Sequence, residues 1–155
     1  MKCDILLLLD TSGSMHGEKI IALNYAAEGF KEGLGRVTYV GQPTILVVTF
    51  GGSVSEPLSI GQIDRFCFEA VGETYLSEAL ARIQGFVRAE TLCVLMSDGH
   101  FVDGDFTKYD RGRPFAIGIG RDRDDGMLAQ FAGGIDRVFS PWEAERLPGA
   151  IAVRA

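Results

Sequence analysis

Oxygen-bearing side chains follow the first apolar stretch of the chain. Residues 5–9 are Ile-Leu-Leu-Leu-Leu, and they lead directly into Asp10, Ser12 and Ser14. A carboxylate and two hydroxyls are hard oxygen donors of the kind that Mg²⁺ prefers, with Mn²⁺ and Ca²⁺ as alternatives. Gly13 allows the backbone to turn tightly between the two serines, whose alternate positions let both hydroxyls point the same way. An ordinary turn has the same composition, so this spacing alone leaves both interpretations open.

A second apolar stretch ends in the same way. Residues 91–97, Thr-Leu-Cys-Val-Leu-Met-Ser, are followed by Asp98 and a glycine. Thr74 lies between the two stretches, at the position of a helix N-cap, where a hydroxyl stabilises a helix by about 1 kcal/mol. Alternatively, Thr74 provides a third neutral oxygen donor, and Gly72 allows its loop to approach the cation closely. Although Asp-Gly is also a common turn, two such strand ends with Thr74 form a constellation of oxygen donors.

Strands and helices alternate around these residues. A continuous apolar run bounded by turn residues is typical of a strand buried on both faces of a parallel sheet, and residues 5–9, 44–50 and 91–97 fit this pattern. Apolar residues recur at helical spacing over 18–34, and again from Leu76 to Val87. The hydroxyl-rich turn therefore connects a strand to a helix.

One further strand is expected at an edge of the sheet. Residues 53–58 follow a Gly-Gly turn and contain Pro57, which favours a short edge strand antiparallel to 44–50. The fold class predicted is α/β: a three-layer, doubly wound, Rossmann-like sheet, mostly parallel with one short antiparallel edge strand and helices on both faces. Such sheets bind their ligands at the carboxyl ends of the strands.

Composition narrows the class of partner. The 155 residues are expected to form a single domain, 1–155, and 15 Lys and Arg against 21 Asp and Glu give a net charge of −6. This charge argues against nucleic acid and against an anionic membrane surface as partners. The first apolar run is too short for a transmembrane helix, which needs about 20 residues. Three isolated cysteines, Cys3, Cys67 and Cys93, are expected to be buried thiols in a cytoplasmic protein.

Taken together, the five oxygen-bearing residues resemble a known motif. At Asp10, Ser12, Ser14, Thr74 and Asp98 the sequence is similar to the von Willebrand factor A-type (vWA) domains, whose metal-ion-dependent adhesion site (MIDAS) draws on three loops. The resemblance implies that these five residues are the ligands of a divalent cation. It extends over the chain, since 115–120, 128–134, 138–139 and 142–151 look like the family's fifth strand, last helix, last strand and a closing helix.

Two details qualify the resemblance. Ser97 precedes Asp98 where many relatives carry Thr, which keeps a hydroxyl. The short length is similar to compact bacterial members near tellurium-resistance and stress-response systems.

The resemblance implies a non-enzymatic protein–protein interaction module. Mg²⁺ binds about six oxygens and rarely loses all its waters. With Asp10 and Asp98 as the only anionic ligands, the ion would keep an open position for an acidic side chain of a partner protein. The residues themselves say nothing about the oligomeric state.

Two alternative functions remain at this point. A Mg²⁺-dependent phosphohydrolase would need a carboxylate in place of Ser12 and a Lys or Arg beside the loops, whereas Lys19 and Arg82 lie within predicted helices. No phosphate-binding loop or hydrolase elbow motif is present, so an enzyme is not expected. A passive scaffold module would use the sheet edge around Val54 and hold a metal for local structure only.

Overall fold

The computed structural model describes residues 2–37, 41–73, 76–101 and 113–154. A six-stranded sheet in the order β3-β2-β1-β4-β5-β6 forms the centre of the molecule. Its strands are β1 (Ile5–Asp10), β2 (Ile45–Phe50), β3 (Leu58–Ser59), β4 (Leu92–Ser97), β5 (Arg113–Gly118) and β6 (Val138–Phe139). All neighbouring strands pair in parallel except β2 and β3. The predicted fold class is therefore confirmed.

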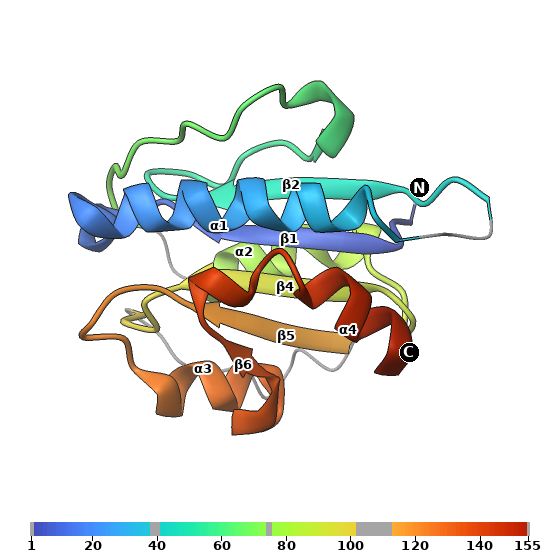
Figure 1. Ribbon diagram of the computed structural model, residues 1–155. Coiled ribbons are helices and arrows are strands. Elements are labelled where there is room, and N and C mark those ends of the chain that lie inside the picture. The colour runs from blue at the N-terminus through green and yellow to red at the C-terminus, as the bar shows by residue number, and fades with distance from the viewer. Residues whose placement is uncertain (1, 38–40, 74–75, 102–112, 155) are drawn as a thin grey trace.

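Helices cover both faces of the sheet (Figure 1). The four α-helices are α1 (Glu18–Leu34), α2 (Leu76–Ile83), α3 (Asp125–Ala132) and α4 (Leu147–Arg154). Helices α1 and α4 share one apolar cluster with the sheet, while α2 and α3 contribute to the cluster on the opposite face. No helix in the described ranges combines the length and the apolar character needed to cross a membrane.

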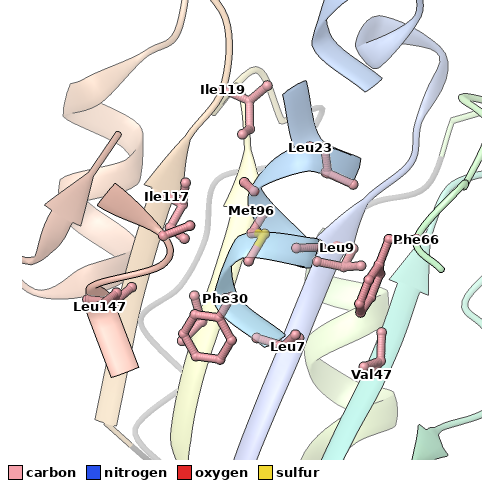
Figure 2. Packing of buried hydrophobic residues seen from close by; sticks show 14 of the residues in the cluster. Leu7, Leu9, Leu23, Phe30, Val47, Phe66, Met96, Ile117, Ile119 and Leu147 are labelled. Carbon is pink, nitrogen blue, oxygen red and sulfur yellow. The ribbon is translucent and has the colours of Figure 1, made fainter. Parts of the chain in front are cut away.

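The alternation of side chains along β1 creates two separate cores. Leu7 and Leu9 pack in the cluster with Leu23 and Phe30 of α1, as Figure 2 shows. Leu6 and Leu8, with Cys93 and Leu95 of β4, pack on the other face against α2 and α3. Because both faces of the sheet are covered, β1 has no solvent-facing position, which explains its unbroken run of apolar residues.

Helix α1 has the bounds predicted from its periodicity. Its exposed side carries Ile21 and Tyr25, while Leu23, Ala27 and Phe30 are buried. Gly29 and Gly33 lie on the side that contacts the segment before α4, and a Cβ built on Gly33 would overlap the carbonyl oxygen of Glu145. The two glycines therefore allow α1 to pack closely against this segment.

The antiparallel edge is shorter than predicted. Within 53–58, Val54 makes a single bridge to Phe50, and the ladder to β2 resumes only at Leu58 and Ser59 of β3. Pro57 has no N–H to donate, and it interrupts the hydrogen bonding between these two contacts.

The closing and second helices also differ from the prediction. In place of one helix over 142–151, a 3₁₀ turn at Pro141–Glu143 is followed by turn residues, and α4 begins at Leu147. Val87 is buried as expected but lies beyond α2, because a 3₁₀ turn at Gln84–Phe86 ends the α-helix. Apolar residues at helical spacing thus predict burial more reliably than they predict where a helix ends.

Two of the three cysteines are buried as predicted, and the third is not. Cys3 and Cys93 are inaccessible, whereas Cys67 is exposed. Cys67 lies between Phe66, which packs in the core, and Phe68, in a segment without helix or strand. Its side chain faces solvent because its neighbours occupy the inward positions. Burial is the main cause that raises the pKa of the Cys3 thiol.

The close approach of α1 to the segment before α4 can be tested with two glycines in helices. Gly33→Ala should destabilise the protein by about 1–3 kcal/mol, because the new methyl group forces backbone apart. Gly149 of α4 has open space around it, so Gly149→Ala should stabilise by about 0.5–1 kcal/mol through helix propensity. Urea unfolding of both variants measures this difference, and equal shifts would contradict the packing described.

Candidate functional site

The two aspartates lie at neighbouring strand ends. Strands β1 and β4 are adjacent and parallel, so their carboxyl ends meet at the same edge of the sheet. Asp10 is the last residue of β1, and Asp98 directly follows β4. The strand order reverses between β1 and β4, which is where open α/β sheets form a ligand-binding crevice.

The structure brings four of the five expected ligands to this edge. They are Asp10, Ser12, Ser14 and Asp98, whereas Thr74 lies outside the described residues. Asp10 is 2% exposed and Asp98 is fully buried, while Ser14 is exposed. The two carboxylates thus lie beneath the surface, and a hydroxyl stands at it.

Asp10 is held by donors from both strands. Its Oδ1 accepts hydrogen bonds from the Ser12 N–H at 3.0 Å and the Ser12 hydroxyl at 2.6 Å. Its Oδ2 accepts the Ser97 hydroxyl at 2.6 Å, and Ser97 Oγ in turn accepts the Gly99 N–H at 3.1 Å. Both oxygens of Asp10 therefore have partners within the protein, and the carboxylate is fixed in orientation.

Burial nevertheless raises the pKa of Asp10 above its ordinary value. Hydrogen bonds from Ser12 and Ser97 act in the opposite direction, and the nearby negative charge of Asp98 adds to the upward shift. The folded state is therefore less favourable to the charge of this carboxylate than water is. A positive charge placed beside Asp10 would act in the opposite direction and stabilise the carboxylate.

The two serine hydroxyls have the spacing of adjacent metal ligands. Ser12 Oγ and Ser14 Oγ are 3.2 Å apart. Two oxygens bound to Mg²⁺ at about 2.1 Å in neighbouring octahedral positions lie about 3 Å from each other. Because the Ser12 hydroxyl donates its hydrogen to Asp10, it can only accept from Ser14, and a lone pair remains available to a cation. The donor set therefore fits a hard divalent ion.

The loop that leads to Thr74 contacts the first turn through its backbone. Gly13 N–H donates to Gly72 O at 2.6 Å, and Val71 N–H donates to Thr11 O at 2.8 Å. Gly72 has a φ of 72°, and a Cβ there would lie 2.5 Å from Gly52 Cα, so no other residue fits without a shift of the backbone. The described part of this loop therefore reaches the serine-rich turn.

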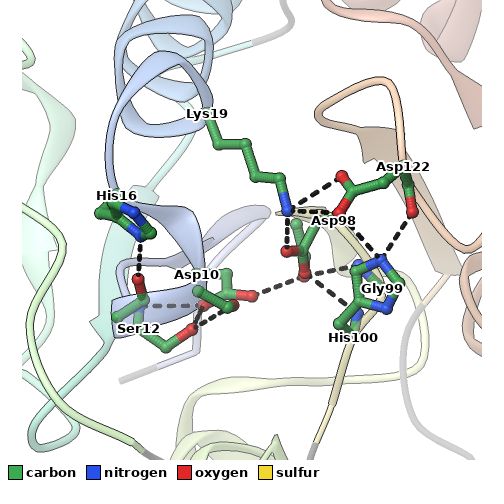
Figure 3. A network of polar contacts seen from close by, with 11 residues as sticks. Asp10, Ser12, His16, Lys19, Asp98, Gly99, His100 and Asp122 are labelled. Carbon is green, nitrogen blue, oxygen red and sulfur yellow. Dashed lines mark hydrogen bonds and ion pairs between the residues drawn. The ribbon is translucent and has the colours of Figure 1, made fainter.

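Lys19 is the residue whose position the sequence did not predict. It lies in the first turn of α1, yet its Nζ is 3.0 Å from Asp98 Oδ2 and 2.9 Å from Asp122 Oδ1 (Figure 3). The expectation that no Lys or Arg adjoins the three loops was therefore wrong. The long side chain reaches from α1 to the loop after β4. Lys19 and Asp98 are 79 residues apart in the sequence, so their proximity is not visible there.

The ion pairs of Lys19 shift its own pKa and the pKa of Asp122. Burial alone would lower the pKa of Lys19, but the hydrogen bonds and charges of Asp122 and Asp98 outweigh it, so the pKa lies above the usual value. The hydrogen bond from Lys19 lowers the pKa of Asp122. Asp98 Oδ1 accepts the His100 N–H at 3.0 Å, so both of its oxygens have partners.

A crevice of about 260 Å³ opens above this edge of the sheet. It is lined by the proposed ligands Asp10, Ser12 and Ser14, together with the neighbouring residues Gly13, Phe50, Gly72, Glu73, His100 and Phe101. Within the described ranges, no three His, Cys, Asp or Glu side chains gather in a way that could hold a metal ion. A cation in this crevice would therefore depend on the hydroxyl oxygens.

No family model and no curated protein matches the sequence. Solved structures do match in fold. A manganese-loaded crystal structure of the Plasmodium vivax TRAP protein has a TM-score of 0.67 and 18% identity, over 94% of this chain and 71% of that chain.

Two further structures give the same result. The proximal thread matrix protein 1 of the mussel byssus, solved with a zinc-occupied MIDAS motif, has a TM-score of 0.66 and 20% identity over 97% of this chain. This chain spans just under half of that protein, 46%. BatB from Bacteroides thetaiotaomicron has a TM-score of 0.60 and 12% identity, with 96% of each chain covered. At these identities the likeness shows the fold, which is of the vWA type.

The bond from Ser97 to Asp10 should be a stabilising feature of the site. Ser97→Ala leaves an oxygen of Asp10 and the Gly99 N–H without their partner, which should lower the free energy of unfolding by about 1.5–3 kcal/mol. Ser14→Ala removes an exposed hydroxyl and should change stability by less than about 0.5 kcal/mol. Urea unfolding in EDTA checks both values, and a neutral Ser97→Ala would contradict the role given to this hydroxyl.

Proposed function

We propose that this chain is a non-enzymatic module that binds a protein partner through a divalent cation, Mg²⁺ in the cell. The observation that carries the proposal is the pair of serine oxygens 3.2 Å apart, beside two buried carboxylates at the reversal of strand order. The partner would present an Asp or Glu side chain. Nucleic acid and membranes are not proposed as partners.

Each residue has a defined part in holding the ion. Ser12 and Ser14 would bind it directly through their hydroxyl oxygens, and Thr74 is proposed as the third hydroxyl. Both oxygens of Asp10 and both of Asp98 already accept hydrogen bonds within the protein, which favours their acting through water molecules. A bound ion would supply a positive charge and an open coordination position, and the neutral hydroxyls would leave that charge largely uncompensated.

Two structural neighbours support a divalent ion at such a site. The TRAP structure is manganese-loaded, and the byssus protein has zinc in its MIDAS motif. These metals are manganese and zinc, so the choice of Mg²⁺ rests on the oxygen-only donor set of this chain.

A Mg²⁺-dependent phosphohydrolase is the second candidate, and Lys19 is the observation that favours it. A lysine beside Asp98 could neutralise a phosphate. Against this, Asp10 is 2% exposed and both its oxygens accept hydrogen bonds, so it is poorly placed to attack phosphorus. Mg²⁺-dependent hydrolysis of p-nitrophenyl phosphate that disappears in Asp10→Asn would establish the enzyme instead.

The passive scaffold has less support. Val54, at the centre of its docking edge, is only 9% exposed, and the edge strand β3 has two residues. Such an edge offers few free backbone groups to a partner.

The proposed cellular setting follows from the sequence. Cys3, Cys67 and Cys93 occur as thiols rather than in disulfides, which favours a reducing compartment, and we propose the cytoplasm. Membership of the compact bacterial stress-response or tellurium-resistance group stays a prediction.

Metal binding is tested by calorimetric titration of Mn²⁺ into EDTA-stripped, dialysed protein. The wild type should bind one ion per chain, and Ser14→Ala should bind at least about tenfold more weakly, since a direct ligand is lost. Ser53→Ala, an exposed serine in the turn after β2, is the matched control and should bind as the wild type does. An unchanged affinity in Ser14→Ala would exclude this turn as the site.

Partner binding is tested by capture on immobilised protein with Mg²⁺ or with EDTA. A true partner should be retained by wild type and Ser53→Ala in Mg²⁺, released by EDTA, and lost with Ser14→Ala. Replacing one Asp or Glu of the captured partner by its amide should abolish binding, because the amide carries no charge for the metal. Retention in EDTA would favour the passive scaffold.

A further inference from the structure

Lys19 links the candidate site to a second carboxylate outside it. The Lys19 side chain is 20% exposed, and its ammonium contacts the fully buried Asp98 and the 62% exposed Asp122. Figure 3 shows the stem of Lys19 extending from α1 to a point between these two carboxylates. One cation thus bridges a buried acid and a surface acid.

The buried acids need such a cation. Asp10 and Asp98 occupy neighbouring strand ends and both are buried, so their negative charges repel each other in a medium that screens poorly. The ammonium of Lys19 lies 3.0 Å from Asp98 and offsets this repulsion. Lys19 therefore does for Asp98 part of what a divalent cation would do.

The same charge also opposes a divalent cation. An ammonium and a metal ion attracted by the same carboxylate repel each other. Lysine has a flexible four-carbon stem, and Asp122 already provides a second partner at 2.9 Å, so Lys19 can shift toward the surface without losing all its ion pairing.

We propose that Lys19 is a built-in counter-ion that competes with the divalent cation for Asp98. It stabilises the metal-free protein and weakens metal binding, so that a higher concentration of the ion is needed to fill the site. This inference rests on the proposed function, since it concerns the same site.

The test compares Lys19→Met, which keeps the apolar stem and removes the charge, with the wild type. Calorimetric titration with Mn²⁺ should show binding about tenfold tighter in Lys19→Met, because one repelling charge is gone. In EDTA the same variant should unfold at a lower temperature than the wild type. Saturating Mn²⁺ should therefore raise the unfolding temperature more in the variant.

Arg121→Met is the matched control. Arg121 is an exposed cation that lines the same groove as Lys19 and Asp122, so its loss removes one positive charge from this surface but none from Asp98. It should change neither Mn²⁺ affinity nor stability in EDTA. Should Lys19→Met fail to fold, Lys19→Gln, which can still donate a hydrogen bond to Asp98, replaces it.

The outcomes separate the two proposals. Equal or weaker Mn²⁺ binding in Lys19→Met, with normal binding by the wild type, overturns the competition and leaves the metal site in place. Tighter binding in Arg121→Met of the same size also overturns it, because the effect would then be general surface charge. Absence of Mn²⁺ binding in wild type and variant alike overturns both the competition and the proposed function.

Discussion

Two buried carboxylates at the ends of adjacent parallel strands are the constraint on which this site depends. Removing a carboxylate from water is unfavourable unless hydrogen bonds or charges compensate, and two neighbouring ones add their mutual repulsion. The chain compensates with the Ser12 and Ser97 hydroxyls on Asp10, and with the His100 N–H and the Lys19 ammonium on Asp98. Retaining both acids inside the core is costly, and the proposed role in holding a cation would account for their presence.

Much of this arrangement could be predicted from the sequence. The strands buried on both faces appear as unbroken apolar runs, and the bounds of α1 follow from its periodicity and its terminal glycines. Once β1 and β4 are taken as parallel strands, Asp10 and Asp98 fall at the same edge of the sheet. Local patterns therefore determined the fold class and the grouping of the acids.

The remaining features depend on contacts between distant parts of the chain. Lys19 looked like an ordinary helix residue, and only the packing of α1 across the sheet brings its ammonium to Asp98. The break before α4 is similar, because apolar spacing over 142–151 predicts burial whether the backbone is a helix or a 3₁₀ turn followed by turn residues. The prediction that Cys67 is buried was wrong because it used only the usual burial of cysteine. In this irregular segment Phe66 and Phe68 take the inward positions, which leaves Cys67 facing solvent.

Main-chain hydrogen bonds join the serine-rich turn to the described part of the loop before Thr74. The two hydrogen bonds run from Gly13 to Gly72 and from Val71 to Thr11, and a Cβ on Gly13 would lie only 3.3 Å from the Gly72 carbonyl oxygen. These hydrogen bonds couple the movements of the two loops. A displacement of either loop would strain both hydrogen bonds, so a movement of the segment before Thr74 would shift the serines proposed as ligands along with it.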